Sequence, residues 1–290
     1  MHIPVLKEEV LKYLNPKPNQ NFIDCTIGSG GHAKAILEKT KPGGKVLGID
    51  RDRENIGNLE KEKIENLILS EGNYSNLKEI IEKNNFKNIS GVLLDLGYSS
   101  FHVDDSLRGF SFLKDEPLDM RYSYKDSITA EEIINKWSNK DLENIFKTYG
   151  EERFSKIIAQ RIIEKREINP IKTTLQLVEI IKESIPKKFQ SKKIHPATKV
   201  FQALRIEVNQ ELENLKEVLP QTIDVLQKNG RVVVISFHSL EDRIAKHFFK
   251  NLFKENKVEL LTKKPVMADE SEVQKNLRSR SAKLRAIRLI

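Results

Sequence analysis

The sequence has little cysteine and no long apolar run, and both absences restrict what the chain can be. Its one cysteine, Cys25, cannot form an internal disulfide or a cysteine-rich zinc cluster, which favours a reducing compartment. No window approaches the roughly 18 uninterrupted apolar residues that a membrane helix needs, and the first residues lack a basic region followed by an apolar stretch. We therefore expect a cytoplasmic protein without a membrane partner. No pair of His and carboxylate residues has a convincing metal-ligand spacing, so no metal site is predicted.

The sequence is also not biased in composition. Hydrophobic residues make up 38% and charged residues 32% of the 290 positions, with 10 Pro and 13 Gly, which excludes a collagen-like or wholly disordered chain. This length suits about one or two domains.

The net charge of +8 is concentrated near the C-terminus. Residues 216–290 hold 16 Lys and Arg against 9 Asp and Glu, whereas residues 1–103 hold 14 of each. The densest run has no acid between its members, which are Lys275, Arg278, Arg280, Lys283, Arg285 and Arg288. A second basic run comprises Lys187, Lys188, Lys192 and Lys193. Such runs either bind a polyanion such as RNA or form solvated surface.

Short apolar runs alternate with helix-like stretches in the first hundred residues. The runs cover 21–25, 45–50, 67–69 and 91–95, and similar runs return at 231–237, 257–261 and 284–289. Alternation of this kind is typical of βαβ units that build a parallel sheet.

Between the fourth and fifth runs the pattern changes. An irregular segment from about 98 to 121 is followed by some ninety helix-like residues, which include capping patterns at 129–132 and 138–141. The sequence therefore predicts one α/β domain, 1–103 and 216–290, with a doubly wound, mostly parallel sheet. A helical domain, 104–215, is inserted into it.

A glycine-rich turn, Gly28 to Gly31, lies between the first strand and the first helix. Glycines let a ligand approach the backbone closely, and the helix N-terminus offers free N–H donors. The second strand ends in Asp50, near the spacing at which a carboxylate binds ribose hydroxyls. Turn and acid together predict a nucleoside ligand.

Two cofactors fit such a turn. Gly28, Gly30 and Ala33 satisfy the G-x-G-x-x-G/A pattern of dinucleotide sites, so an NAD-dependent dehydrogenase is one hypothesis. Asp24 precedes the glycines, however, where a pyrophosphate has no use for a carboxylate. An acid there suits S-adenosylmethionine, which has a cationic amino-acid end.

Ten blocks of sequence together resemble the bacterial small-subunit ribosomal RNA (cytosine-N4) methyltransferase family. The blocks are Asp24–His32, Asp50–Asp52, Leu94–Ser100, Arg108–Phe112, Pro117–Arg121, Tyr149–Arg153, His195–Thr198, Phe201–Ile206, Ser236–Arg243 and Arg278–Arg285. They cover nearly the whole chain in order.

The resemblance implies a class I methyltransferase-like fold and S-adenosylmethionine-dependent methylation of the exocyclic amine of one cytidine in small-subunit ribosomal RNA. The partner is then that RNA or the assembled small subunit, and the oligomeric state stays open. Family cofactor contacts carry over onto Gly30, Gly31, His32, Asp50, Tyr74, Asp95 and His102. The chain departs from the family at Tyr74, where Phe is usual, and at Phe101 and His102, where the family has Pro and Gln.

Asp95 is the candidate catalytic residue. It ends the fourth strand, where an open α/β sheet places its ligand crevice, and it can contact the cofactor, the target amine or both. Cytosine N4 is a weak nucleophile, so an acceptor that orients it and takes its proton would help. The alternative is a structural carboxylate at a strand end.

Candidate substrate contacts come from three places. Arg108, Phe110, Asp119 and Arg121 occupy the long loop after the fourth strand and can clamp a flipped cytidine, although Phe110 can equally anchor the loop to the core. Lys199 lies near the middle basic run. Ser239 follows the fifth strand at the crevice edge, where it can instead cap a helix.

A function without catalysis is the main alternative to the methyltransferase hypothesis. The chain would then be an RNA-binding ribosome assembly factor that keeps a cofactor fold without turnover.

Overall fold

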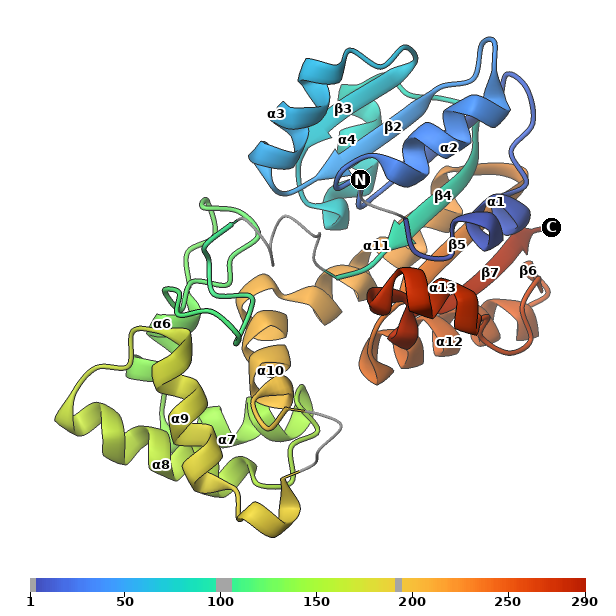
Figure 1. The fold of residues 1–290 in the computed structure, drawn as a ribbon. Coiled ribbons are helices and arrows are strands. Elements are labelled where there is room, and N and C mark those ends of the chain that lie inside the picture. Colours follow the sequence, from blue (N-terminus) through green and yellow to red (C-terminus); the bar gives the residue numbers. More distant parts are fainter. Residues whose placement is uncertain (1–3, 98–105, 191–194) are drawn as a thin grey trace. The chain divides into compact units, whose positions relative to one another are not determined.

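The computed structural model describes residues 4–97, 106–190 and 195–290, and the chain divides into two compact units (Figure 1). Unit 1 comprises Met1–Gly97 and Leu212–Ile290, and unit 2 comprises Tyr98–Glu211. The sequence analysis placed these boundaries at 103/104 and 215/216. An α/β unit is thus interrupted by a helical one, with boundaries a few residues earlier than expected.

Unit 1 is built on a sheet of seven strands in the described residues, in the order β3-β2-β1-β4-β5-β7-β6. The strands are β1 (Asn21–Asp24), β2 (Val46–Asp50), β3 (Leu67–Glu71), β4 (Ile89–Asp95), β5 (Leu226–Ser236), β6 (Val258–Leu260) and β7 (Lys283–Leu289). Neighbours among β1 to β5 are parallel, and β7 is antiparallel to both of its neighbours, β5 and β6. The predicted doubly wound, mostly parallel sheet is confirmed.

Helices cover both faces of this sheet (Figure 1). One apolar cluster joins the sheet to α4 (Leu77–Lys83), α11 (Glu211–Val225) and α12 (Ser239–Lys254). The other joins it to α1 (Lys7–Leu14), α2 (Gly31–Thr40) and α3 (Arg53–Glu62). The short segments η1 (Tyr74–Asn76), α13 (Glu270–Lys275) and η3 (Leu277–Ser281) complete the unit.

The strands are apolar throughout because alternate residues enter different clusters. In β4, Val92 and Leu94 face one cluster, while Leu93 faces the other. A strand buried on both faces therefore has a continuous apolar sequence, which is the pattern that predicted it.

Unit 2 packs five helices around one apolar cluster within its described residues. They are α6 (Ala130–Lys136), α7 (Asn139–Thr148), α8 (Ser155–Ile168), α9 (Thr174–Ser184) and α10 (Thr198–Asn209), with a short η2 (Lys187–Phe189) after α9. The predicted capping box at 129–132 is present: the Thr129 hydroxyl accepts from the Glu132 N–H while the Glu132 carboxylate accepts from the Thr129 N–H.

Side chains at the end of α10 tie the last residues of unit 2 to its first described loop. Asn209 accepts a hydrogen bond from the Tyr122 N–H at 2.8 Å and donates one to the Met120 carbonyl at 2.8 Å. Glu211 accepts from the Tyr122 hydroxyl at 2.7 Å and pairs with both Nε and Nη2 of Arg205. Because Asn209 is fully buried, each of its polar groups needs such a partner, which fixes this junction.

None of the helices in the described ranges has both the length and the apolar character needed to cross a membrane.

Gly91 provides a test of packing between the sheet and α1. A Cβ added there would lie 2.8 Å from the Phe22 ring and 3.1 Å from Leu14, so Gly91→Ala should overpack the core. We expect a loss of about 1–3 kcal/mol in the free energy of unfolding, measured by urea denaturation. Gly57→Ala, in α3 with nothing within 4 Å of its added Cβ, is the matched control and should stabilise by roughly 0.5–1 kcal/mol. Equal effects of the two changes would contradict this packing.

Candidate active site

The glycine-rich turn after β1 needs glycine for two physical reasons. Gly28 and Gly30 have φ of 49° and 76°, in the left-handed region that favours glycine. A Cβ on Gly30 would also lie 2.8 Å from Leu59, and one on Gly31 would lie 2.4 Å from Pro4. The turn therefore brings bare backbone to the N-terminus of α2, as a ligand that approaches closely requires.

Asp50, at the end of β2, is bonded to the turn that it faces. Its Oδ2 accepts hydrogen bonds from the Gly28 N–H and from Asn55 Nδ2, both at 3.0 Å, and its Oδ1 accepts from the Asp52 N–H at 2.8 Å. The acid thus orders the turn, and its predicted contact with a nucleoside stays a prediction.

Asp24 and Cys25, at the end of β1, are both buried. Burial raises the pKa of Asp24 from 3.8 to about 6, against the opposing effects of the His32 charge and of a hydrogen bond from the Thr26 N–H. Burial also raises the pKa of the Cys25 thiol well above its ordinary value, with a further contribution from Asp24. A thiol that stays protonated is a poor nucleophile, so this cysteine is a core residue.

Asp95, at the end of β4, lies beside the turn and beside α2. The Thr26 hydroxyl accepts a hydrogen bond from the Asp95 N–H at 2.8 Å, which ties β4 to the turn. His32 Nε2 lies 3.5 Å from Asp95 Oδ2, at the outer limit of a hydrogen bond. Burial alone would lower the pKa of His32, but the hydrogen bond and charge of Asp95, together with the charge of Asp24, raise it overall.

Three buried polar atoms of this pair have no hydrogen-bond partner within the described part of the chain. They are Asp95 Oδ1 and both ring nitrogens of His32. Buried polar atoms are nearly always satisfied, so a carboxylate oxygen and an imidazole without partners beside a glycine-rich turn indicate a ligand with polar groups. S-adenosylmethionine fits these groups. Its amino-acid and ribose parts need hydrogen-bond donors and acceptors, and the backbone of the turn, two carboxylates at strand ends and an imidazole provide both.

Tyr74 follows β3 and is half-buried against the same apolar cluster as α4. The residue before it, Asn73, donates from Nδ2 to Asn214 Oδ1 at 2.9 Å and accepts from the Ser75 N–H at 3.1 Å. These bonds fix the start of η1 and hence the ring at the C-terminal edge of the sheet. Gly30, Gly31, His32, Asp50, Tyr74 and Asp95 therefore all follow or end parallel strands at one edge, whereas His102 lies outside the described residues.

Of the predicted substrate residues, Arg108 and Phe110 are more buried than a surface contact requires. Arg108 is 2% exposed, its Nη1 donates to the Tyr122 carbonyl at 2.9 Å, and its guanidinium lies over the Tyr124 ring. Phe110 is stacked on Tyr122 with ring centroids 5.6 Å apart. Both side chains hold the loop of unit 2 together, which is the anchoring role that the sequence left open for Phe110.

Asp119 and Arg121 form a bidentate ion pair, with Arg121 Nε and Nη2 at 2.9 and 2.7 Å from the carboxylate oxygens. The hydrogen bond to Asp119 is the main cause of the raised pKa of Arg121. Lys199, on α10, donates to the Glu151 carbonyl at 2.8 Å. Contacts of these three residues with RNA stay predictions.

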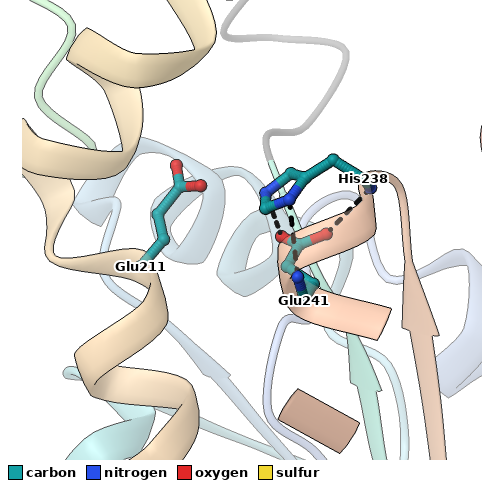
Figure 2. Close-up of side chains that lie close together, drawn as sticks. All are labelled: Glu211, His238 and Glu241. Carbon is teal, nitrogen blue, oxygen red and sulfur yellow. Dashed lines mark hydrogen bonds and ion pairs between the residues drawn. The ribbon is translucent and has the colours of Figure 1, made fainter. Parts of the chain in front are cut away.

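The start of α12 differs from the expectation that Ser239 caps it. Figure 2 shows His238 and Glu241 bonded to each other. His238 is the N-cap: its Nδ1 accepts from the Glu241 N–H, and Glu241 accepts from the N–H groups of Phe237 and His238. Ser239 is thus the first helical residue, and it remains a candidate substrate contact.

Sequence reasoning gave no positioning role to Thr26, Asn55 or Asn73. Each forms a hydrogen bond that fixes a neighbouring site residue. A short polar residue directly after or just beyond a buried strand is the pattern that could have pointed to them.

The ionisation of Asp24 should affect stability. An acid whose pKa is higher in the folded protein binds more protons there, so the folded state loses stability as pH rises from about 4 to about 6. Asp24→Asn removes this titration. We expect the stability of the variant relative to wild type to increase by about 3 kcal/mol between pH 3.5 and pH 7, measured by urea denaturation at each pH. A stability difference that does not change with pH would show that Asp24 titrates normally.

Comparison with known proteins identifies the family of the chain. A family model described as the MraW methylase family matches residues 1–290. A Clostridium botulinum protein named ribosomal RNA small subunit methyltransferase H is 44% identical over 307 aligned positions, which cover 100% of this chain and 99% of the relative. A protein of the same name from Halothermothrix orenii is 45% identical, with 98% and 97% covered.

One solved structure supports the fold. It is a Clostridium thermocellum protein provisionally described as an rRNA methylase, with a TM-score of 0.50, 13% identity and full coverage of both chains. The dehydrogenase hypothesis has no support from these relatives, and the family predicted from the motifs is confirmed. The chain belongs to the MraW methylase family and is a methyltransferase that uses S-adenosylmethionine.

Proposed function

We propose that this protein methylates the exocyclic N4 amine of a cytidine in small-subunit ribosomal RNA. The observation on which the proposal depends is Asp95, at the C-terminal end of β4. Its Oδ1 is buried and has no hydrogen-bond partner among the described residues, while its Oδ2 lies 3.5 Å from His32 Nε2. The names of the relatives supply the class of RNA, and the residue blocks that resemble the cytosine-N4 family supply the target atom.

Asp95 can assist the amine in two ways. When bound, S-adenosylmethionine supplies a methyl group on a positively charged sulfur. Asp95 Oδ1 can accept a hydrogen bond from the N4 amine, which orients the nitrogen, and can take its proton as the new C–N bond forms. Burial lowers the pKa of His32, but the neighbouring carboxylates of Asp95 and Asp24 raise it overall, which favours the protonated imidazole beside the other oxygen of Asp95.

The C-terminal basic run divides into a paired and an exposed part. Arg285 is buried and bidentate with Asp242, and Arg288 lies 2.6 Å from Glu259. Lys275 and Arg280, around η3, are exposed, which leaves them to neutralise phosphates. A partner that carries many phosphates in the cytoplasm, either free RNA or the assembled small subunit, fits this charge.

Asp95→Asn tests the proposal against the alternative of a non-catalytic assembly factor. An amide cannot take a proton, so methyl transfer should fall by at least about 100-fold while RNA binding stays within twofold of wild type. The measurement is transfer of labelled methyl to small subunits, and to their extracted RNA, from cells lacking the protein, followed by nucleoside analysis for N4-methylcytidine.

Asp224→Asn is the control, because Asp224 is an exposed carboxylate on α11 that pairs with Lys78. It should leave both readouts unchanged. Wild-type protein that binds cofactor and RNA but gives no labelled N4-methylcytidine with either substrate would overturn the proposal and favour the assembly factor.

A further inference from the structure

Unit 2 presents an exposed aromatic ring with two cations beside it. We call it the Phe189 platform and define it by Arg153, Phe154, Lys188 and Phe189. The guanidinium of Arg153 lies 4.7 Å from the centroids of both rings, and Lys188 Nζ lies 5.0 Å from that of Phe189. The two rings are 5.6 Å apart at 43°.

The platform is open to solvent on one side and anchored on the other. Phe189 is 45% exposed, whereas Phe154 is half-buried against the apolar cluster of unit 2. The η2 turn that presents Phe189 is held by Gln190, whose Nε2 donates to the carbonyls of Lys182 and Ile185 at 3.0 and 2.8 Å. A ring fixed in this way loses little entropy when a ligand stacks on it.

The two cations of the platform have no carboxylate partner in the part of the chain that the structure describes. Within the described ranges, neither Arg153 nor Lys188 pairs with a carboxylate, although the unit contains many ion pairs elsewhere, such as Arg161 with Glu164. An apolar ring exposed to water is unfavourable, and an Arg that lies against it without a carboxylate gains no salt bridge. Together the ring and the cations suit a binding partner that is both planar and anionic.

We propose that the Phe189 platform stacks an unpaired base of the RNA substrate, with Arg153 and Lys188 on the adjacent phosphates. The inference rests on the proposed function, because it takes RNA as the substrate. An unpaired nucleotide supplies both a π-face for the ring and a negative charge for the cations, whereas a paired helix hides its base faces. An acidic protein segment would match the charge but gives no flat face for the ring.

Binding of a 5′-labelled, single-stranded 12-nucleotide RNA, followed by fluorescence anisotropy, tests the platform in the full-length protein. Phe189→Ala should weaken binding about tenfold, since stacking on an aromatic side chain contributes roughly 1–3 kcal/mol per base. Phe189→Trp, which keeps an aromatic face, should restore affinity to within about twofold of wild type. A double-stranded RNA of the same sequence should bind equally to all three proteins.

Phe253→Ala is the matched control, because Phe253 is 49% exposed, lies on α12 of unit 1 and has no cation–π partner among the described residues. It should bind the RNA like wild type. Circular dichroism and urea denaturation of each variant would separate loss of binding from loss of folding.

The salt dependence of RNA binding should distinguish the contribution of the cations from that of base stacking. Lys188→Ala should lower the slope of log affinity against log salt by about 1, whereas Phe189→Ala should leave the slope unchanged. The inference is overturned if Phe189→Ala and Phe253→Ala bind alike, or if Phe189→Ala weakens double-stranded RNA equally. Methyl transfer by wild type in the assay above would then still support the proposed function, so the two can fail separately.

Discussion

Hydrogen bonds that converge on the Asp50 carboxylate hold the active edge of the sheet in place. They join the end of β2 to the glycine-rich turn, to Asp52, which is the N-cap of α3, and to Asn55 within that helix. Gly28 and Gly30 have backbone angles that other residues rarely adopt, and a turn of this kind keeps one shape only when its amides have fixed partners. The acid at a strand end thus organises the loop before any ligand is considered.

The same edge of the sheet brings together the ionisable side chains of Asp24, His32 and Asp95, and burial limits how well water screens their charges. Asp24, His32 and Asp95 are close enough for each to shift the pKa of His32 or Asp24. A buried carboxyl that is half protonated near pH 6 costs less than a buried anion would, and the imidazole beside Asp95 compensates part of the remaining charge. The pKa values of Asp24 and His32 therefore depend on each other and on the charge of Asp95.

Much of this arrangement was predictable from sequence because buried parallel strands and positive-φ glycines leave strong local patterns. The continuous apolar runs located β1 to β5, and they placed Asp95 at the end of the fourth strand, where the structure has it. Helix α1 has no such pattern and was missed, as was the use of His238 in place of Ser239 as the N-cap. The burial of Arg108 also could not be predicted. It depends on a hydrogen bond to the carbonyl of Tyr122, 14 residues later in the chain, and no local sequence pattern shows that contact.

The bonds between Tyr122 and the end of α10 bear on how the chain reaches its native topology. Strands β4 and β5 are neighbours in the sheet, yet all of unit 2 separates them in sequence. If unit 2 folds first, Tyr122 is held beside Asn209 and Glu211, and the flexible chain that must be closed between the two strands becomes roughly threefold shorter. The shorter loop lowers the entropic free-energy cost of pairing β4 with β5 by about 1 kcal/mol. In that order of folding, the hydrogen bonds that join the two ends of the insert would bring β4 and β5 closer together along the chain before the sheet forms.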